Sequence, residues 1–123
     1  MIEVTAAIIM DNDKILICQR PKRKKFADFW EFPGGKTEPG ETSEECVIRE
    51  CHEELTVTIE TDKLFADITK DDLHITFFIC RITDGTITLK EHQAAIWITK
   101  EELSNYTFCP ADEEILELLM RQK

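Results

Sequence analysis

Glycine, proline and the larger aromatic residues are scarce in this chain of 123 residues, which has four glycines, four prolines, two tryptophans and one tyrosine. This composition excludes collagen-like, low-complexity and linker-rich sequences. Long apolar runs are absent as well, and the first residues lack the basic start and apolar core of a signal peptide. We therefore expect one globular domain over residues 1–123 that acts in the cytoplasm without contacting a membrane.

Positive charge is also in short supply, because 15 lysine and arginine residues stand against 25 acidic residues and leave a net charge of −10. A surface this acidic argues against direct binding to nucleic acid. The one dense basic run is Lys22–Lys25, which reads Lys-Arg-Lys-Lys. It is either a solvated loop that offsets the acidic surface or a segment that attracts phosphate groups to a site entrance. The sequence leaves both interpretations open.

Cysteines in a paired arrangement are missing too. The chain has five cysteines, an odd number, and no two of them are spaced as Cys-x-x-Cys. Because most of them lie in apolar surroundings, we expect reduced thiols of a cytosolic protein, and neither a disulfide framework nor a zinc site. The five are Cys18, Cys46, Cys51, Cys80 and Cys109.

What the chain does contain is an alternation of β-branched apolar stretches with amphipathic helical stretches. The first two β stretches flank the turn signal Asp11-Asn12-Asp13 and predict a hairpin. A helix is predicted over residues 43–55, because Thr42 and Glu45 form a capping box at its start. The expected strands are residues 2–10, 14–20, 57–68, 73–82 and 94–98, and shorter helices are expected at residues 100–103 and 112–121.

Three glutamates of the long helix form the most informative pattern. Glu50, Glu53 and Glu54 are spaced i, i+3 and i+4, so their side chains project from the same side of a helix. Three carboxylates placed there repel one another, and a bound cation relieves that repulsion. Oxygen ligands alone suit a hard, octahedral ion such as Mg²⁺ or Mn²⁺. A solvated acidic helix face is the alternative, and the triplet alone does not decide between the two.

The sequence before this triplet supports the metal-binding interpretation. From Gly35 to Val57 the chain closely resembles the Nudix box, which is a glycine, five residues, a glutamate, seven residues and then Arg-Glu-apolar-x-Glu-Glu-x-Gly-apolar. Two positions depart from this motif, with Cys51 where a larger apolar residue is usual and Thr56 where glycine is usual. Cys51 should be tolerated as a small buried hydrophobe. The β-branched Thr56 resists a left-handed conformation and should give a differently shaped helix exit. The matching residues are Gly35, Glu41, Arg49, Glu50, Glu53, Glu54 and Val57.

The resemblance implies an α/β (α+β) fold, the Nudix α/β/α sandwich with a mixed β-sheet between helices. It also implies a hydrolase that uses Mg²⁺, with Mn²⁺ as a substitute, to split a nucleoside triphosphate into the monophosphate and pyrophosphate. The implied metal ligands are Glu50, Glu53, Glu54 and the carbonyl group of Gly34. Glu50 is also expected to activate water, and Glu53 to act in catalysis as a principal ligand. Arg49 would pair with a helix glutamate and hold its orientation.

The similarity extends over nearly the whole chain and is that of the MutT branch of the family. It includes Ala6–Ile9, Gln19-Arg20-Pro21 and residues 29–35, which read Phe-Trp-Glu-Phe-Pro-Gly-Gly. The segment Lys90–Gln93, followed by a tryptophan, resembles the loop that carries one further catalytic or metal-binding glutamate in this branch. Glu91 therefore joins the expected site, both as a catalytic residue and as a metal ligand.

Four residues are expected to bind the substrate. Arg20 stands where the MutT branch has a substrate-contacting arginine, and Phe32 and Phe78 are candidates for stacking on the base. Asp112 lies in the segment that reads the base in relatives, but it also precedes a predicted helix, where aspartate is a favoured N-cap. Both roles can hold at once. MutT proper carries asparagine where Asp112 stands, which puts selectivity for 8-oxoguanine in question.

The expected substrate is 8-oxo-dGTP, since MutT-like chains are commonly of that type. CTP or a modified dCTP is an alternative, because CTP-hydrolysing relatives share the Glu-His-Gln segment and the tripeptide Pro-Ala-Asp. A non-catalytic module that binds nucleotide and regulates a partner is a second alternative, although such a module would be expected to lose charges from the box. In each case the ligand is a small nucleotide, and the protein is a monomer or homodimer.

Overall fold

The computed structural model describes residues 1–121, and the chain opens with the predicted hairpin. Strands β1 (Ile2–Asp11) and β2 (Lys14–Gln19) are antiparallel, with Met10 opposite Ile15. Asn12, in the two-residue turn between them, has a φ angle of 57°. Asparagine tolerates this left-handed conformation better than most residues, which explains why the turn forms at this point.

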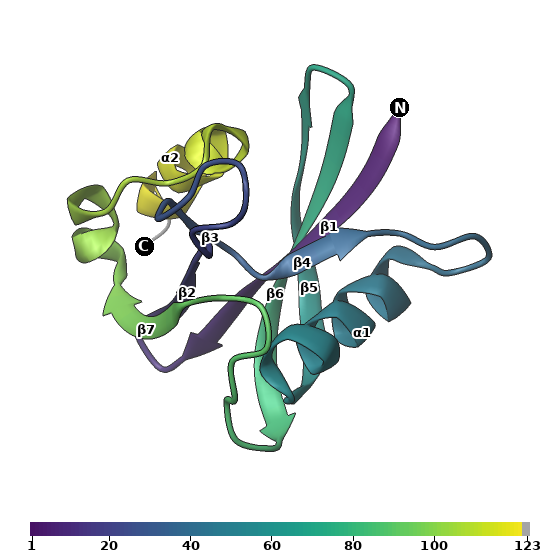
Figure 1. Cartoon of the computed structure of the whole chain (residues 1–123), viewed down its shortest axis with the longest axis horizontal. Coiled ribbons are helices and arrows are strands. Elements are labelled where there is room, and N and C mark those ends of the chain that lie inside the picture. The colour runs from purple at the N-terminus through teal and green to yellow at the C-terminus, as the bar shows by residue number, and fades with distance from the viewer. Residues whose placement is uncertain (122–123) are drawn as a thin grey trace.

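Seven strands form one mixed sheet, in the order β3-β2-β1-β6-β5, with β4 paired to β1 and β7 paired to β2 (Figure 1). β1 runs parallel to β6 along most of its length, and its far end pairs with β2. This long strand therefore connects the two halves of the sheet. The other strands are β3 (Trp30–Glu31), β4 (Gly34–Lys36), β5 (Thr58–Lys70), β6 (Leu73–Asp84) and β7 (Ala94–Thr99).

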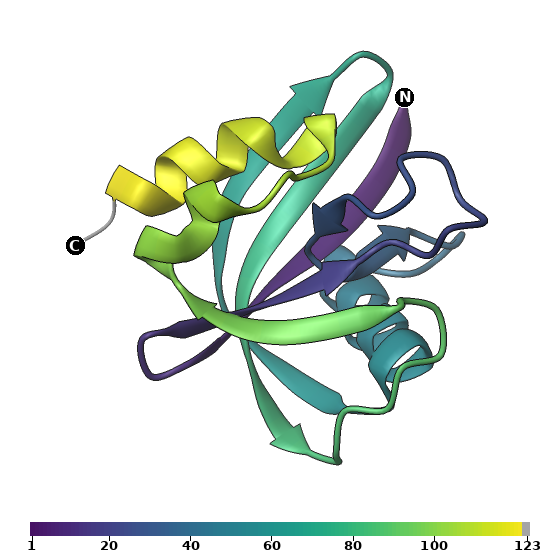
Figure 2. The ribbon, with the colours of Figure 1, turned by 60° about the vertical axis from the view of Figure 1, so that its left-hand side comes forward.

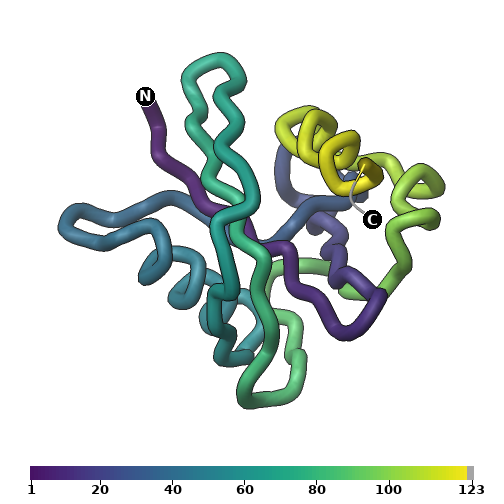
Figure 3. The backbone as a smooth tube through the Cα atoms, turned by 180° about the vertical axis from the view of Figure 1, so that it is seen from behind, coloured from purple at the N-terminus to yellow at the C-terminus, as the bar shows by residue number. Residues whose placement is uncertain are grey.

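Helices cover both faces of the sheet. On one face lies α1 (Ser43–Leu55), whose Val47 and Leu55 are buried against apolar side chains of β1, β2 and β6. On the other face lie α2 (Glu113–Arg121) and the short helix η1 (Lys100–Asn105), as Figure 2 shows. Their buried residues Leu103, Ile115 and Leu119 belong to a second core. Seen from behind in Figure 3, α1 and α2 lie on opposite sides of the strands. The predicted mixed sheet between helices is confirmed.

The start of α1 is capped as predicted. The Thr42 hydroxyl accepts a hydrogen bond from the Glu45 amide at 3.1 Å, and the Glu45 carboxylate accepts one from the Thr42 amide at 2.9 Å. This reciprocal pair satisfies two donors that would otherwise be unpaired at the start of the helix. It fixes the first residue of α1 and, with it, the rotational position of the three glutamates further along.

The prediction for the exit of α1 is wrong. Thr56 adopts the left-handed conformation that glycine would favour, with φ 60° and ψ 28°. Its amide donates to the carbonyl of His52 at 3.0 Å, and its hydroxyl oxygen lies 2.6 Å from the carbonyl oxygen of Leu55 and 3.1 Å from that of Thr86. These hydrogen bonds offset a conformational cost of about 1–2 kcal/mol. The helix exit therefore keeps its shape despite the substituted residue.

None of the helices described within residues 1–121 is long and apolar enough to span a membrane. All five cysteines are buried and carry free thiols. Three of them, Cys18, Cys51 and Cys80, belong to the core between α1 and the sheet. Burial raises the pKa of each of these three thiols, so they stay protonated and behave as small apolar side chains.

Candidate active site

A cleft of about 780 Å³ opens beside the middle of β1, and residues from distant parts of the sequence line it. Its walls include Gly34 and Gly35 of β4, Glu54 of α1 and Asp112 of the short helix η2 (Pro110–Asp112). The basic loop that follows β2 supplies Lys24 and other residues to its rim. The fold therefore brings the glycine pair, the acidic helix and the loop cations to one place.

Glu54 is the helix glutamate that reaches furthest into the protein. Its side chain is 13% exposed, and its Oε1 atom has no hydrogen-bond partner among residues 1–121. Burial raises the pKa of Glu54 to about 9, and the negative charges of Glu50 and Glu31 contribute in the same direction. A carboxylate in these surroundings lacks a compensating positive charge, which a metal ion would provide.

Glu50 lies against the glycine pair. A Cβ atom at Gly35 would collide with the Glu50 carboxylate, and one at Gly34 would collide with the Thr5 carbonyl of β1. The backbone of β4 can approach both neighbours only because these two residues have no side chain. The glycines are therefore required by the close packing of β4 between β1 and the acidic face of α1.

Arg49 forms ion pairs with four carboxylates at once, of which the Glu38 carboxylate is the most distant, at 3.6 Å. Its Nε and one terminal nitrogen contact the two oxygens of Glu41, at 2.7 and 3.0 Å. The other terminal nitrogen lies 2.9 Å from Glu50 and 3.2 Å from Glu53. These hydrogen bonds lower the pKa of Glu41 to about 2 and raise the pKa of Arg49. Arg49 does pair with helix glutamates, and of its two partners on α1, Glu53 is the more exposed, at 57%.

The buried His92 and the half-buried Glu31 are two further residues of the cleft, and the sequence did not predict either of them as part of the site. The Glu31 carboxylate accepts hydrogen bonds from Arg20 at 2.9 Å and from the Nε2 atom of His92 at 2.8 Å. Burial works to raise the pKa of Glu31, but the two hydrogen bonds outweigh it, and the pKa is lowered. The other ring nitrogen of His92, Nδ1, has no hydrogen-bond partner within residues 1–121 and lies 4.0 Å from the Oε1 atom of Glu54. His92 thus stands between Glu31 and the acidic helix.

Asp112 lines the same cleft as Glu54 but comes from a different element, the short helix η2. It is 7% exposed. Burial raises the pKa of its carboxyl group well above the usual range; the charge of Glu31 adds to this rise, and the charge of Arg20 opposes it. Burial therefore shifts the balance toward the protonated form of Asp112, compared with an exposed aspartate. A protonated carboxyl group can donate one hydrogen bond and accept another, as an amide does.

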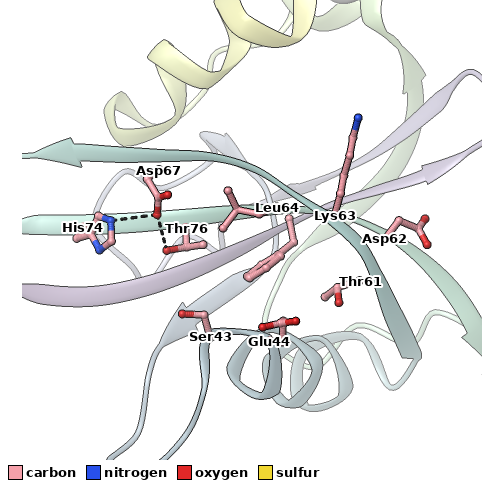
Figure 4. Close-up of a pocket in the computed structure, with 10 residues that line it drawn as sticks. Ser43, Glu44, Thr61, Asp62, Lys63, Leu64, Asp67, His74 and Thr76 are labelled. Carbon is pink, nitrogen blue, oxygen red and sulfur yellow. Dashed lines mark hydrogen bonds and ion pairs between the residues drawn. The ribbon is translucent and has the colours of Figure 1, made fainter.

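The two phenylalanines expected at the base lie on opposite faces of the sheet. Phe32 lines the cleft, although it is 4% exposed and its ring packs against Phe77 and Phe108. Phe78 instead lines a separate hollow beside the N-terminal end of α1, drawn in Figure 4 with His74 and Asp67. The fold does not bring Phe78 to the cleft, because its position on β6 points it toward the core under α1.

Glu91 lies at the rim of the cleft but is not joined to the acidic helix. Its carboxylate contacts Arg23 at 2.5 Å and Lys24 at 3.7 Å. Of the expected site residues, the cleft is lined by Arg20, Phe32, Gly34, Glu54, Glu91 and Asp112. Glu50 lies next to the lining residue Gly35, and Glu53 is joined to Glu50 through Arg49, so the fold does not place Glu53 in the lining.

These residues suit a divalent cation. The donors are carboxylate and carbonyl oxygens, which hard ions prefer, and the unpartnered buried oxygen of Glu54 is available. Within the described part of the chain, no three acidic, histidine or cysteine side chains already stand close enough together to hold an ion. Glu50 and Glu53 are occupied by Arg49, and Glu91 by Arg23. Binding would therefore require some of these side chains to change partners.

Comparison with known proteins places this geometry in a family. The family model of the NUDIX domain matches residues 1–119. A CTP pyrophosphohydrolase of Escherichia coli is 38% identical, over 98% of this chain and 92% of its own. An 8-oxo-dGTP diphosphatase of the same species is 34% identical, over 98% of this chain and 97% of its own.

Solved structures agree with the sequence comparison. The solution structure of the Escherichia coli ORF135 protein has a TM-score of 0.83 and 39% identity, and covers 98% of this chain and 89% of that chain. A MutT structure, studied from Aliivibrio salmonicida and Vibrio cholerae, has a TM-score of 0.83 and 34% identity, and covers 99% of this chain and 98% of that chain. With the glycine pair, the capped acidic helix and the matching fold in place, this chain belongs to the Nudix family.

Proposed function

We propose that this protein hydrolyses nucleoside triphosphates to the monophosphate and pyrophosphate, with 8-oxo-dGTP as its preferred substrate and Mg²⁺ as its cofactor. The supporting observation is that one cleft is lined both by Glu54 of the acidic helix and by the buried Asp112, whose pKa is raised. The first suits a metal-bound phosphate chain, and the second suits a base. Curated relatives with these activities match nearly the whole chain.

The phosphate end of the cleft is assigned to residues of α1 and β4. The carbonyl group of Gly34 and the carboxylates of Glu50, Glu53 and Glu54 would hold the cation, and Glu91 would join them. A divalent cation supplies neutralisation of phosphoryl charge and acidification of water. Glu50 accepts the proton of the attacking water, while Arg49 fixes the orientation of its carboxylate by the contact at 2.9 Å.

The base end of the cleft explains why 8-oxoguanine would be preferred over guanine. Guanine presents two acceptors, N7 and O6, along one edge. Oxidation at C8 places a hydrogen on N7, so that this edge becomes one donor beside one acceptor. A protonated Asp112 presents the complementary acceptor and donor, as asparagine would. The substitution of aspartate for asparagine is therefore compatible with 8-oxoguanine selectivity when the side chain is buried.

CTP is the second candidate substrate, and the same residue favours it. Cytosine also offers a donor beside an acceptor, at N4 and N3, and protonated Asp112 matches that pair equally well. The relative that is 38% identical is named a CTP pyrophosphohydrolase. The two substrates are separated by the size of the base and not by hydrogen-bonding pattern, so only direct comparison of their turnover decides between them.

The deciding experiment measures pyrophosphate release from 8-oxo-dGTP, dGTP, CTP and 5-methyl-dCTP under one set of conditions with Mg²⁺. We expect the highest kcat/KM for 8-oxo-dGTP, low turnover of dGTP, and a loss of roughly a hundredfold or more in kcat for Glu53→Gln. Higher kcat/KM for either cytosine nucleotide would favour the second candidate. A non-catalytic binding module would turn over none of the four, and Glu53→Gln would bind nucleotide as well as the unmodified chain does.

The surroundings in which the protein works are also part of the proposal. Five free thiols suit a reducing compartment, and we assign the protein to the cytoplasm. Its ligand is a small nucleotide, and the net charge of −10 disfavours direct contact with nucleic acid or an anionic membrane. The protein acts as a monomer or homodimer.

A further inference from the structure

We infer that Arg23 and Lys24 bind the phosphates of the substrate and, in its absence, keep Glu91 occupied. This inference rests on the proposed function. In the nucleotide-free protein both cations pair with Glu91. When a triphosphate enters the cleft, the two cations move to its phosphate oxygens, and the released Glu91 carboxylate completes the set of oxygens that holds the divalent cation.

The ion pairs that must break are exposed and therefore weak. The Arg23 side chain is 62% exposed, Lys24 is 41% exposed and Glu91 is 38% exposed. Ion pairs in such positions contribute little free energy, because water screens the charges and the side chains lose conformational entropy on pairing. A triphosphate carries several negative charges against the single charge of Glu91. It can therefore displace Glu91 from both cations.

Two of the three side chains that take part in the exchange, Lys24 and Glu91, already line the cleft in which the phosphates would bind. Lys24, Glu91 and Glu54 all line the same cleft, so phosphates held there would be within reach of the loop cations. The released carboxylate of Glu91 would face the cleft in which the buried Oε1 atom of Glu54 accepts no hydrogen bond from the described residues.

Hydrogen bonds fix the backbone at both ends of the basic loop, so the exchange needs only the side chains of Arg23 and Lys24 to change partners. Arg20 donates from Nε to the carbonyl of Lys25 at 2.8 Å, and the side chain of Gln93 donates to the carbonyl of Arg20 at 2.7 Å. The backbone amide of Gln93 also donates a hydrogen bond to the backbone carbonyl of Gln19, at 3.0 Å. These contacts hold the two loops, residues 21–28 and 90–93, side by side while the cations at the tip change partners.

The same loop provides a matched control. Lys22 pairs with Asp28 at 3.0 Å, and the ammonium group of Lys25 lies over the ring of Phe26, 5.2 Å from its centre. Neither contacts Glu91 among the described ion pairs. The double variant Lys22→Gln/Lys25→Gln therefore removes the same charge from the same loop as Arg23→Gln/Lys24→Gln does, but leaves Glu91 occupied.

The test measures Mn²⁺ binding to the full chain by isothermal titration calorimetry, without nucleotide and then with a non-hydrolysable α,β-methylene triphosphate. Without nucleotide, we expect Arg23→Gln/Lys24→Gln to bind Mn²⁺ about two- to fivefold more tightly than the control double variant. Adding Glu91→Gln should abolish that gain. In the otherwise unmodified chain, Glu91→Gln should weaken Mn²⁺ binding only when the analogue is present.

Two results would overturn the exchange. One is equal Mn²⁺ affinity of the two double variants, and the other is an equal effect of Glu91→Gln with and without the analogue. Pyrophosphate release by the unmodified chain, measured separately with Mg²⁺, tells this failure apart from failure of the proposed function. Turnover together with either result removes the exchange and leaves the function standing, whereas absence of turnover with every triphosphate removes the function.

Discussion

Replacing the buried Asp112 by asparagine should stabilise the protein, and the gain should grow with pH. Asparagine resembles the protonated aspartate in size and in its donor and acceptor groups, but it carries no charge at any pH. Burial raises the pKa of Asp112 well above its usual range, so the folded state binds a proton that the unfolded state releases. The difference between the two states is the origin of the pH dependence.

The sign and the slope follow from proton linkage. Above the ordinary aspartate pKa, near 3.8, the unfolded chain loses the proton while the folded chain keeps it. Folding of the unmodified protein then becomes less favourable by about 1.4 kcal/mol for each pH unit, until the pH reaches the raised folded pKa. Asp112→Asn has no such loss, because asparagine does not ionise. The free energy of unfolding of Asp112→Asn should equal that of the unmodified protein near pH 3 and exceed it increasingly at pH 5, 6 and 7, with at most that slope.

The assay is urea unfolding followed by tryptophan fluorescence, repeated across this pH range for both proteins. Glu114→Gln is the control, because Glu114 is an exposed acidic residue of α2, the helix that begins directly after Asp112. Its difference from the unmodified protein should stay nearly flat with pH. A flat difference for Asp112→Asn as well would show that Asp112 is ionised when folded, and the explanation of base selectivity would fall with it.

Two further predictions test other parts of the structure. Gly35→Ala should lower kcat by about 10²–10³-fold without unfolding the protein, because the new Cβ displaces the Glu50 carboxylate. Steady-state kinetics measures kcat, and a circular-dichroism spectrum checks that the variant is folded. An unchanged kcat would contradict the close contact between Gly35 and the Glu50 carboxylate. His74→Gln should reduce the free energy of unfolding below about pH 6.5, since hydrogen bonding to Glu3 at 2.6 Å, aided by Asp67 at 3.1 Å, raises the pKa of His74. That stabilisation is present below the unfolded pKa and is lost as pH rises through the raised folded pKa, so a loss that grew with pH would refute the assignment.

Local signals in the sequence were enough to predict the element that carries the chemistry. The capping box at Thr42 and Glu45 gave the start of α1, and the spacing of its apolar residues gave the buried face. The hairpin turn at Asn12 was likewise a local signal. The prediction for the helix exit was wrong because the exit depends on a contact between residues far apart in the sequence. The hydroxyl of Thr56 finds a partner in Thr86, thirty residues away, and no local rule anticipates that contact.

The parts of the site that were missed depend on contacts between distant segments. Glu31 and His92 lie sixty-one positions apart, and neither has a spacing pattern that announces a buried pair. Glu31 lies in residues 29–35 and His92 in Lys90–Gln93, and both segments resemble the MutT branch. That resemblance is the signal by which the sequence could have pointed to them. The prediction that Phe78 contacts the base was wrong. Alternation along a strand shows which residues share a face with Phe78, but not which face of the sheet that is. Which face holds the cleft is decided by the packing of α1 and α2.

The irregular edge strand has a consequence for behaviour in crowded solution. β5 lies at the end of the sheet order, and thirteen residues of exposed strand edge are a template for pairing with another chain. Its register against β6 shifts at Thr58/Ile59, Thr61/Lys63 and Leu64/Ala66. Each shift bends the strand and interrupts the row of free amides and carbonyls. No long, straight stretch of ladder is left for a second molecule to extend, and fibril growth from this edge is discouraged.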